Sequence, residues 1–157
     1  MIPDHVRAQL DAAYSDAQYQ QIRELWKHHS ISEDQRSIEG LMSTLTEDCE
    51  YVMRPSGTKW QGKVGATRFY TELLSAFPDI KFELQNIVIG PQGVYEEADV
   101  TGTLLGSWQG WRGDGQKIEF TVQIFFPWDE AAGKFRGEII HLDYDRILAR
   151  YGVCQVT

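Results

Sequence analysis

Apolar side chains recur at helical spacing through the first half of the chain. Over residues 16–29 they fall on one stripe, three and four positions apart, which predicts an amphipathic helix. A second helix is predicted to open at Ser32 and to carry apolar positions as far as Leu45. A third is predicted over residues 63–77, where Pro78 ends it. The pattern therefore predicts three helices before most of the sheet.

The apolar pattern changes to strict alternation in the second half of the chain, which is typical of strands. Strands are predicted over residues 51–54, 80–89, 93–105, 117–126 and 135–143. Short connections suited to antiparallel neighbours occur at residues 91–93, 110–116 and 129–134. Helices first and a meandering sheet afterwards indicate the α+β class, with a bent sheet folded over the helices as an open-ended cone. Such a concavity is suited to a small ligand.

Composition limits the size of the protein and its partners. A length of 157 residues and an apolar share of 42% suit a single domain over residues 1–157. The net charge of −8 offers no positive field for phosphate groups, so neither nucleic acid nor a membrane is expected as a partner. Cys49 and Cys154 form neither a disulfide framework nor a zinc motif, so no metal is expected. The amino terminus lacks a secretion signal, which favours the cytoplasm.

Acid and base groups gather in the stretch from Gly137 to Gly152. On a strand, His141 and Asp143 share one face, whereas Glu138 and Leu142 share the other. If the first face lines a cavity, the histidine and the carboxylate form an acid/base unit whose pKa values burial can move toward neutrality. The alternative is a satisfied polar pair at a strand end, with Asp143 capping the helix that follows.

Further side chains are candidates for the wall of such a cavity. Some are aromatic and exclude water, and others are polar: Trp26, His29, Tyr51, Trp60, Thr121 and Phe125. Gln123 is a candidate donor on the mixed face of the strand predicted over residues 117–126. The indoles of Trp108 and Trp111, in a glycine-rich loop, are candidates for a lid or a dimer contact.

A series of short motifs runs through residues 22–152 in a specific order. They are Leu25-Trp26, Asp48 to Tyr51, Trp60-Gln61-Gly62, Ala76-Phe77-Pro78-Asp79, Gly102-Thr103, Phe125-Phe126-Pro127, and Gly137-Glu138 with Asp143. This series resembles the SnoaL-like polyketide cyclase or ester cyclase branch of the nuclear transport factor 2-like superfamily. The resemblance implies a cone-shaped, curved, mixed or antiparallel sheet wrapped around the three helices (a cystatin-like α+β barrel), and a homodimer formed through its outer face.

The resemblance also implies a chemistry. In polyketide cyclases, an aspartate near the end of the last strand is the general acid/base for an intramolecular aldol closure, without metal or cofactor. Asp143 occupies the matching position, so it would take a proton from carbon beside a carbonyl. Thr121, Gln123 or His141 would then steady the enolate oxygen. The expected ligand is a small apolar or carbonyl-containing compound.

Two other functions stay open because the same scaffold serves several of them. One is a non-catalytic module that binds a small ligand. The other is an epoxide hydrolase, in which this superfamily joins an arginine to two aspartates. Glu97 and Asp99 share a strand face here, and Arg54 is the candidate arginine.

Overall fold

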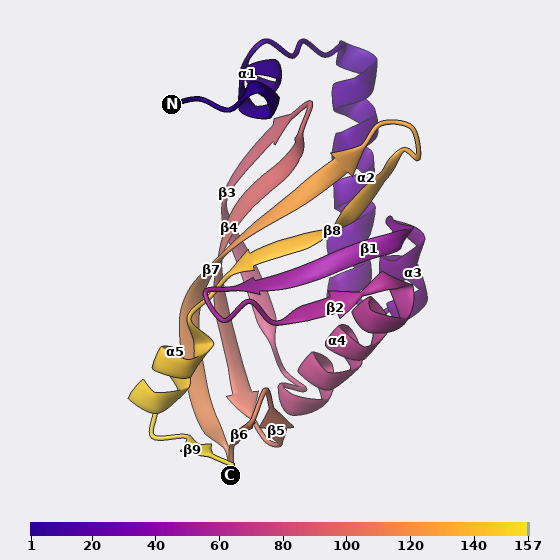
Figure 1. Cartoon of the computed structure of the whole chain (residues 1–157). Coiled ribbons are helices and arrows are strands. Elements are labelled where there is room, and N and C mark those ends of the chain that lie inside the picture. The colour runs from indigo at the N-terminus through magenta and orange to yellow at the C-terminus, as the bar shows by residue number, and fades with distance from the viewer. Residues whose placement is uncertain (157) are drawn as a thin grey trace.

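The two longest helices, α2 (Asp16–Asp34) and α4 (Gly62–Ala76), cover one face of a curved sheet in the computed structural model, which describes residues 1–156 (Figure 1). The helices are α1 (Asp4–Leu10), α2 (Asp16–Asp34), α3 (Ile38–Ser43), α4 (Gly62–Ala76) and α5 (Tyr144–Arg150). No helix within this part of the chain is long and apolar enough to cross a bilayer.

Six strands form the main sheet, in the order β2-β1-β8-β7-β4-β3, and three short strands form a second sheet, β5-β6-β9. The strands are β1 (Leu45–Arg54), β2 (Lys59–Gln61), β3 (Lys81–Gly90), β4 (Gly93–Leu104), β5 (Ser107–Trp108), β6 (Trp111–Arg112), β7 (Gln116–Asp129), β8 (Lys134–His141) and β9 (Cys154–Gln155). β1 and β8 run parallel, and the other neighbours are antiparallel. The predicted α+β class with a curved mixed sheet is confirmed, but across residues 1–156 the sheet does not close into a barrel.

The second helix starts later than the sequence predicts. α2 continues through Ser32, whose hydroxyl donates to the His28 carbonyl at 2.7 Å instead of capping a new helix. The chain reverses at Arg36, which has a φ of 57°, and Ser37 caps α3. Because α2 is longer than predicted, it carries Glu33 to the wall of an internal cavity.

β1 also differs from its prediction, because it begins at Leu45 rather than at Tyr51. Leu45 is fully buried and pairs with Phe135 of β8. Pairing with a neighbouring strand therefore extends β1 into residues that helical spacing had assigned to a helix. The neighbouring strand β8 ends at His141, so Asp143 lies beyond the strand.

The inward face of the sheet carries the core. Along β7, Ile118, Val122 and Ile124 are buried, while Thr121 and Gln123 are exposed on the outer face. This confirms the predicted alternation of the strand. α4 contacts β1, and α2 contacts β3 and β4, so both helices pack against the buried side.

The second sheet and α5 lie at the end of the main sheet opposite α1 (Figure 1). The hairpin of β5 and β6 is tied to α5 by two hydrogen bonds: Trp111 Nε1 donates to Asp145 Oδ1 at 2.6 Å, and the Tyr144 hydroxyl donates to the Gln109 carbonyl at 3.0 Å. Both hairpin indoles are buried, with Trp108 exposed by only 5%. The hairpin is therefore fixed in place with Trp108 facing inward.

Candidate functional site

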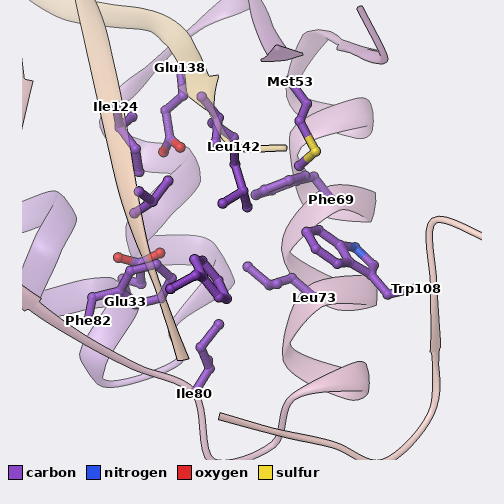
Figure 2. A pocket seen from close by; sticks show the side chains of 13 residues that line it. Glu33, Met53, Phe69, Leu73, Ile80, Phe82, Trp108, Ile124, Glu138 and Leu142 are labelled. Carbon is purple, nitrogen blue, oxygen red and sulfur yellow. The ribbon is translucent and has the colours of Figure 1, made fainter. Parts of the chain in front are cut away.

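A narrow cavity lies between the inward face of the sheet and the helices α2 and α4 (Figure 2). Most of its wall is apolar, with side chains that include Met53, Leu73, Phe82, Phe120, Ile124 and Leu142. The volume of the cavity is about 30 Å³. Two carboxyl groups, those of Glu33 and Glu138, interrupt the apolar surface. An apolar cavity with a few convergent polar groups is typical of a ligand site.

Glu138 is the more deeply buried of these carboxyl groups, with 3% of its surface exposed. The Tyr70 hydroxyl donates to Glu138 Oε1 at 2.6 Å, and His29 Nε2 lies 3.1 Å from the same oxygen. The Tyr51 hydroxyl in turn donates to Tyr70 at 3.3 Å. Both of these contacts are made by Oε1, and the second oxygen of Glu138, Oε2, is the one left for a ligand.

Thr44 decides how the ring of His29 is protonated. The Thr44 hydroxyl donates its proton to the Leu41 carbonyl at 2.7 Å, so toward His29 Nδ1, also 2.7 Å away, it can only accept. His29 Nδ1 is therefore the donor to Thr44. Since His29 Nε2 also contacts Glu138 Oε1, one proton lies between the ring and the carboxyl group. His29 and Glu138 thus form a buried acid/base pair.

The two tyrosines of this network are neutral donors. Burial raises the pKa of Tyr70 and of Tyr51 well above the usual range of a phenol, and the Glu138 carboxylate raises both further. Neither hydroxyl ionises near neutral pH, so both keep the protons with which they support Glu138.

Glu33 is the second carboxyl group of the cavity, and its environment favours the protonated form. Burial raises the pKa of Glu33 well above its usual range, and the nearby Glu138 and Glu96 carboxyl groups add to the shift. The residue keeps partial contact with solvent, but its carboxyl group points into the cavity (Figure 2). That group has no hydrogen-bond partner among residues 1–156. A neutral Glu33 can therefore donate a hydrogen bond to a ligand oxygen.

Glu96 belongs to a small hollow that adjoins the cavity and shares Glu33 with it. Burial and the Glu138 charge raise the pKa of Glu96 to about 7, while a hydrogen bond from Trp26 Nε1 at 2.9 Å acts in the opposite direction. Burial and the charge of Glu138 therefore favour the protonated forms of Glu33 and Glu96, which lowers the repulsion among the three carboxyl groups.

The residues expected to be catalytic at the end of β8 lie outside the cavity. Asp143 is exposed and caps α5, where its carboxylate accepts from the backbone N–H of Arg146 at 3.2 Å. His141 is exposed on the outer face, paired with Gln123 of β7. The expectation that Asp143 and His141 face the cavity is wrong. The side chains that point inward are those of Glu138, Ile140 and Leu142, which alternate with them along the chain.

Gln123, Thr121 and Phe125 share this outer face, so the expectation that they contribute to a pocket is wrong as well. Gln123 Nε2 donates to Glu97 Oε2 at 2.9 Å, and the Thr121 hydroxyl donates to Asp99 Oδ1 at 2.8 Å. Phe125 is partly exposed. These polar side chains form ladders between β4 and β7 on the side of the sheet that the helices do not cover.

The constellation considered for an epoxide hydrolase is not assembled in the cavity. Glu97 and Asp99 use their carboxylates in the ladders of the outer face, and Arg54 is exposed at the end of β1. None of the three lines the internal cavity. The geometry therefore gives no support to that chemistry.

The other predicted pocket residues lie on the inner side. His29 and Tyr51 belong to the buried network, and Trp26 lines the adjoining hollow. Trp60 is buried behind the cavity wall, with its ring 5.0 Å from the ring of Phe69. These residues supply one member of the acid/base pair and part of its surroundings.

Sequence reasoning missed Glu138, Glu33 and Tyr70 as site residues. A signal for Glu138 was present, since it alternates with Ile140 and Leu142 and so shares the more apolar face of the strand. The helical stripe that includes Tyr70 predicted burial but no chemistry. Nothing in the sequence pattern distinguished Glu33 from the other charged residues near the end of the first helix.

Comparison with known proteins identifies a family for this chain and solved structures with a similar fold. The sequence profile of the family described as SnoaL-like polyketide cyclase matches residues 16–150. A comparison with curated protein sequences finds no match.

Solved structures resemble this one closely in fold and weakly in sequence. A protein from Jannaschia sp. CCS1, assigned to the SnoaL-like polyketide cyclases, is 16% identical, with a TM-score of 0.75 and coverage of 88% of this chain and 96% of that one. IdmH from Streptomyces antibioticus, a proposed polyketide cyclase, is 18% identical, with a TM-score of 0.68 and coverage of 84% and 99%. AclR from Streptomyces galilaeus, a proposed hydroxylase, is 17% identical, with a TM-score of 0.69 and coverage of 85% and 97%. At these identities the likeness establishes the fold alone.

Proposed function

We propose, from the premise that the chain belongs to the SnoaL-like polyketide cyclase family, that it is a cofactor-independent cyclase or isomerase acting on a small apolar carbonyl compound. The observation that supports this proposal is the Glu138–His29 pair, whose carboxyl group borders a largely apolar cavity. A carboxylate in such surroundings is less solvated than in water and is therefore a stronger base toward carbon.

The proposed reaction begins at Glu138. Its free oxygen takes the proton from carbon next to the substrate carbonyl, and the electron pair of that C–H bond moves into the enolate. The proton on His29 and the Tyr70 hydroxyl balance the charge around the carboxyl group. Neutral Glu33 donates a hydrogen bond to the enolate oxygen, where negative charge develops. In a cyclase the enolate carbon attacks a second carbonyl and the new alkoxide takes up the proton, whereas in an isomerase the proton returns to another carbon.

This proposal assigns the role of base to Glu138, which lies five residues before Asp143 in the chain and faces the interior of the fold. Asp143 is exposed, and its carboxylate is engaged at the start of α5. Glu138 lies within β8, on the face that reaches the cavity.

The test uses β-tetralone, a small apolar ketone with acidic C–H bonds, in deuterium oxide. We expect the protein to accelerate incorporation of deuterium next to the carbonyl, as followed by proton NMR. E138Q removes the base and keeps the shape of the side chain, so the acceleration should fall at least about 100-fold. E97Q, which changes a glutamate on the outer face, and D143N should retain the wild-type rate.

Deuterium incorporation by E138Q at the wild-type rate would contradict the base assignment, provided that circular dichroism shows both proteins folded. Loss of the activity in D143N alone would return the role to the end of β8.

A non-catalytic binding module is the second candidate. What favours it is that His29, Thr44 and Tyr70 already satisfy one another and Glu138 Oε1 without any ligand, as a purely structural network would. Under this alternative β-tetralone would raise the melting temperature by binding the folded state, yet no deuterium would enter it beyond the buffer rate.

The homodimer stays a prediction. It is supported by a row of apolar side chains across the outer face of the sheet, where Val88, Tyr95, Phe125 and Ile139 are paired from β3 to β8. Val88 is 66% exposed and Tyr95 38%. A second copy of the chain would remove this surface from water.

A further inference from the structure

Two buried polar side-chain atoms within residues 1–156 have no hydrogen-bond partner, Thr46 Oγ1 and Trp108 Nε1. Of these two residues, only Trp108 lines the internal cavity. Leaving a buried N–H unpaired costs on the order of 1–3 kcal/mol. An unpaired donor in the wall of a cavity therefore calls for an explanation.

Three of the other four tryptophans show what this chain does with an indole N–H that has a carboxylate nearby. The indoles of Trp26, Trp111 and Trp128 donate to the carboxylates of glutamate or aspartate residues, at 2.9, 2.6 and 2.6 Å. The indole of Trp108 instead has aromatic neighbours, with ring centres 5.9 Å away for Phe77 and 5.3 Å away for Tyr144. These neighbours fix the ring without using its donor.

Trp108 lies across the cavity from the two carboxyl groups (Figure 2). Glu33 and Glu138 supply the polar groups on one side, and the indole supplies the only neutral ring donor in the cavity wall that the structure describes. The side chains between them, which include Met53, Leu73 and Leu142, are apolar. A ligand that spans the cavity would meet polar groups at both ends and hydrocarbon in the middle.

We infer that Trp108 Nε1 donates a hydrogen bond to an oxygen of the ligand and thereby determines specificity. The ligand class is a flat or ring-shaped apolar compound with two oxygen functions at opposite ends, one that accepts from the Glu33 carboxyl group and the other, a carbonyl oxygen, that accepts from Trp108. The inference rests on the proposed function only in taking the same cavity as the ligand site. Trp108 takes no part in the proton transfer.

The test compares two probes of nearly equal shape, para-diacetylbenzene, which has a carbonyl at each end, and para-diethylbenzene, which has none. The five tryptophans give five indole N–H signals in a nitrogen-15 correlation spectrum, and the signal that W108F removes is that of Trp108. We expect para-diacetylbenzene to move this signal downfield and para-diethylbenzene to leave its proton shift nearly unchanged. W108F should lower the affinity for para-diacetylbenzene about tenfold and the affinity for para-diethylbenzene less than about threefold.

Replacing Trp108 with benzothienylalanine is the matched control, because it removes the N–H but keeps the ring. It should reproduce the tenfold loss. The inference is overturned if the Trp108 signal is unmoved with para-diacetylbenzene bound, if both probes lose affinity equally in this variant, or if para-diacetylbenzene fails to bind up to its solubility limit. The same titration in E138Q should still move the Trp108 signal, so a failure of the proposed base leaves this result intact.

Discussion

Glu138 is distinguished from the other acidic residues by its neighbours rather than by its type. Tyr70 and His29 both contact one carboxyl oxygen and leave the other free beside an apolar wall. Exposed glutamates such as Glu97 share the same side-chain chemistry but are hydrogen-bonded to amides in contact with water. A base directed at carbon needs the first environment, because water would solvate it in the second.

The arrangement around His29 makes a prediction that does not depend on any substrate. With Nδ1 donating to Thr44 and a further proton between Nε2 and Glu138, the ring should show hydrogen-bonded protons at both nitrogens. Nitrogen-15 NMR of histidine-labelled protein measures this directly. E138Q should remove the proton shared between Nε2 and the carboxyl group.

His28 is the internal control, because its ring is exposed and contacts only the Ser43 hydroxyl. Its signals should be the same in wild type and E138Q. A neutral His29 in the wild type, with its only proton on Nε2, would contradict the proton assignment.

At the level of elements, an irregularity in β8 turns Glu138 inward. Phe125 of β7 pairs with Ile139 of β8, and Trp128 pairs with Phe135. Between these two pairs the chain advances by three residues in β7 but by four in β8. This extra residue changes the phase of the alternation, so Phe135 and Glu138 both face the interior although they are three apart. The bulge contains Gly137, which has a φ of 117°.

Gly137 should therefore resist substitution. A Cβ at this position would collide with the Glu50 carbonyl of β1, and the positive φ disfavours any other residue. We expect G137A to lower the free energy of unfolding by about 3 kcal/mol and to impair Glu138-dependent exchange, as measured by urea denaturation and deuterium incorporation.

G106A is the matched control, since the nearest atoms to its Cβ lie at 3.9 and 4.0 Å, which is ordinary contact. Its stability should stay within about 1 kcal/mol of wild type. If G137A were as stable and active as G106A, the bulge would not be what positions Glu138.

For the whole molecule, the buried carboxyl groups determine how stability depends on pH. The pKa of Glu96 is about 7 in the folded protein against 4.5 when it is free in solution, so the folded state binds more protons between these values. Stability should therefore fall as pH rises from about 5 to 8, and the raised pKa of Glu33 acts in the same direction. For Glu96 alone, the difference corresponds to about 3 kcal/mol.

Urea denaturation across this pH range checks the prediction. E96Q should flatten the curve and gain stability at pH 8, because glutamine keeps an acceptor for Trp26 without a charge. E97Q should follow the wild-type slope, since its neighbours Gln123 and Asn86 hold the pKa of Glu97 low and it stays ionised throughout. Equal pH slopes for wild type and E96Q would contradict the assigned titration.

The local elements of this fold were accessible from the sequence because they follow from spacing alone. The helical stripe of α4 and the alternation of β7 were predicted within a few residues of their ends. The ends of elements that depend on pairing with a distant strand were not predicted. Leu45 has helical spacing in the sequence, but it pairs with Phe135 and begins β1. The alternation of residues 138–143 was also predicted correctly. The face expected to point inward was the wrong one, because Glu138 and Leu142 are buried and His141 is exposed.

The sequence by itself determined that this chain forms an α+β domain of one family, because periodicity and the order of motifs are properties of neighbouring residues. Only the tertiary structure decided that Glu138 rather than Asp143 borders the cavity. That choice depends on a bulge at Gly137 and on His29 and Tyr70, which come from helices far away in the chain. Burial and charge pairing exist only after distant segments meet, so the chemistry of the site is fixed at that level.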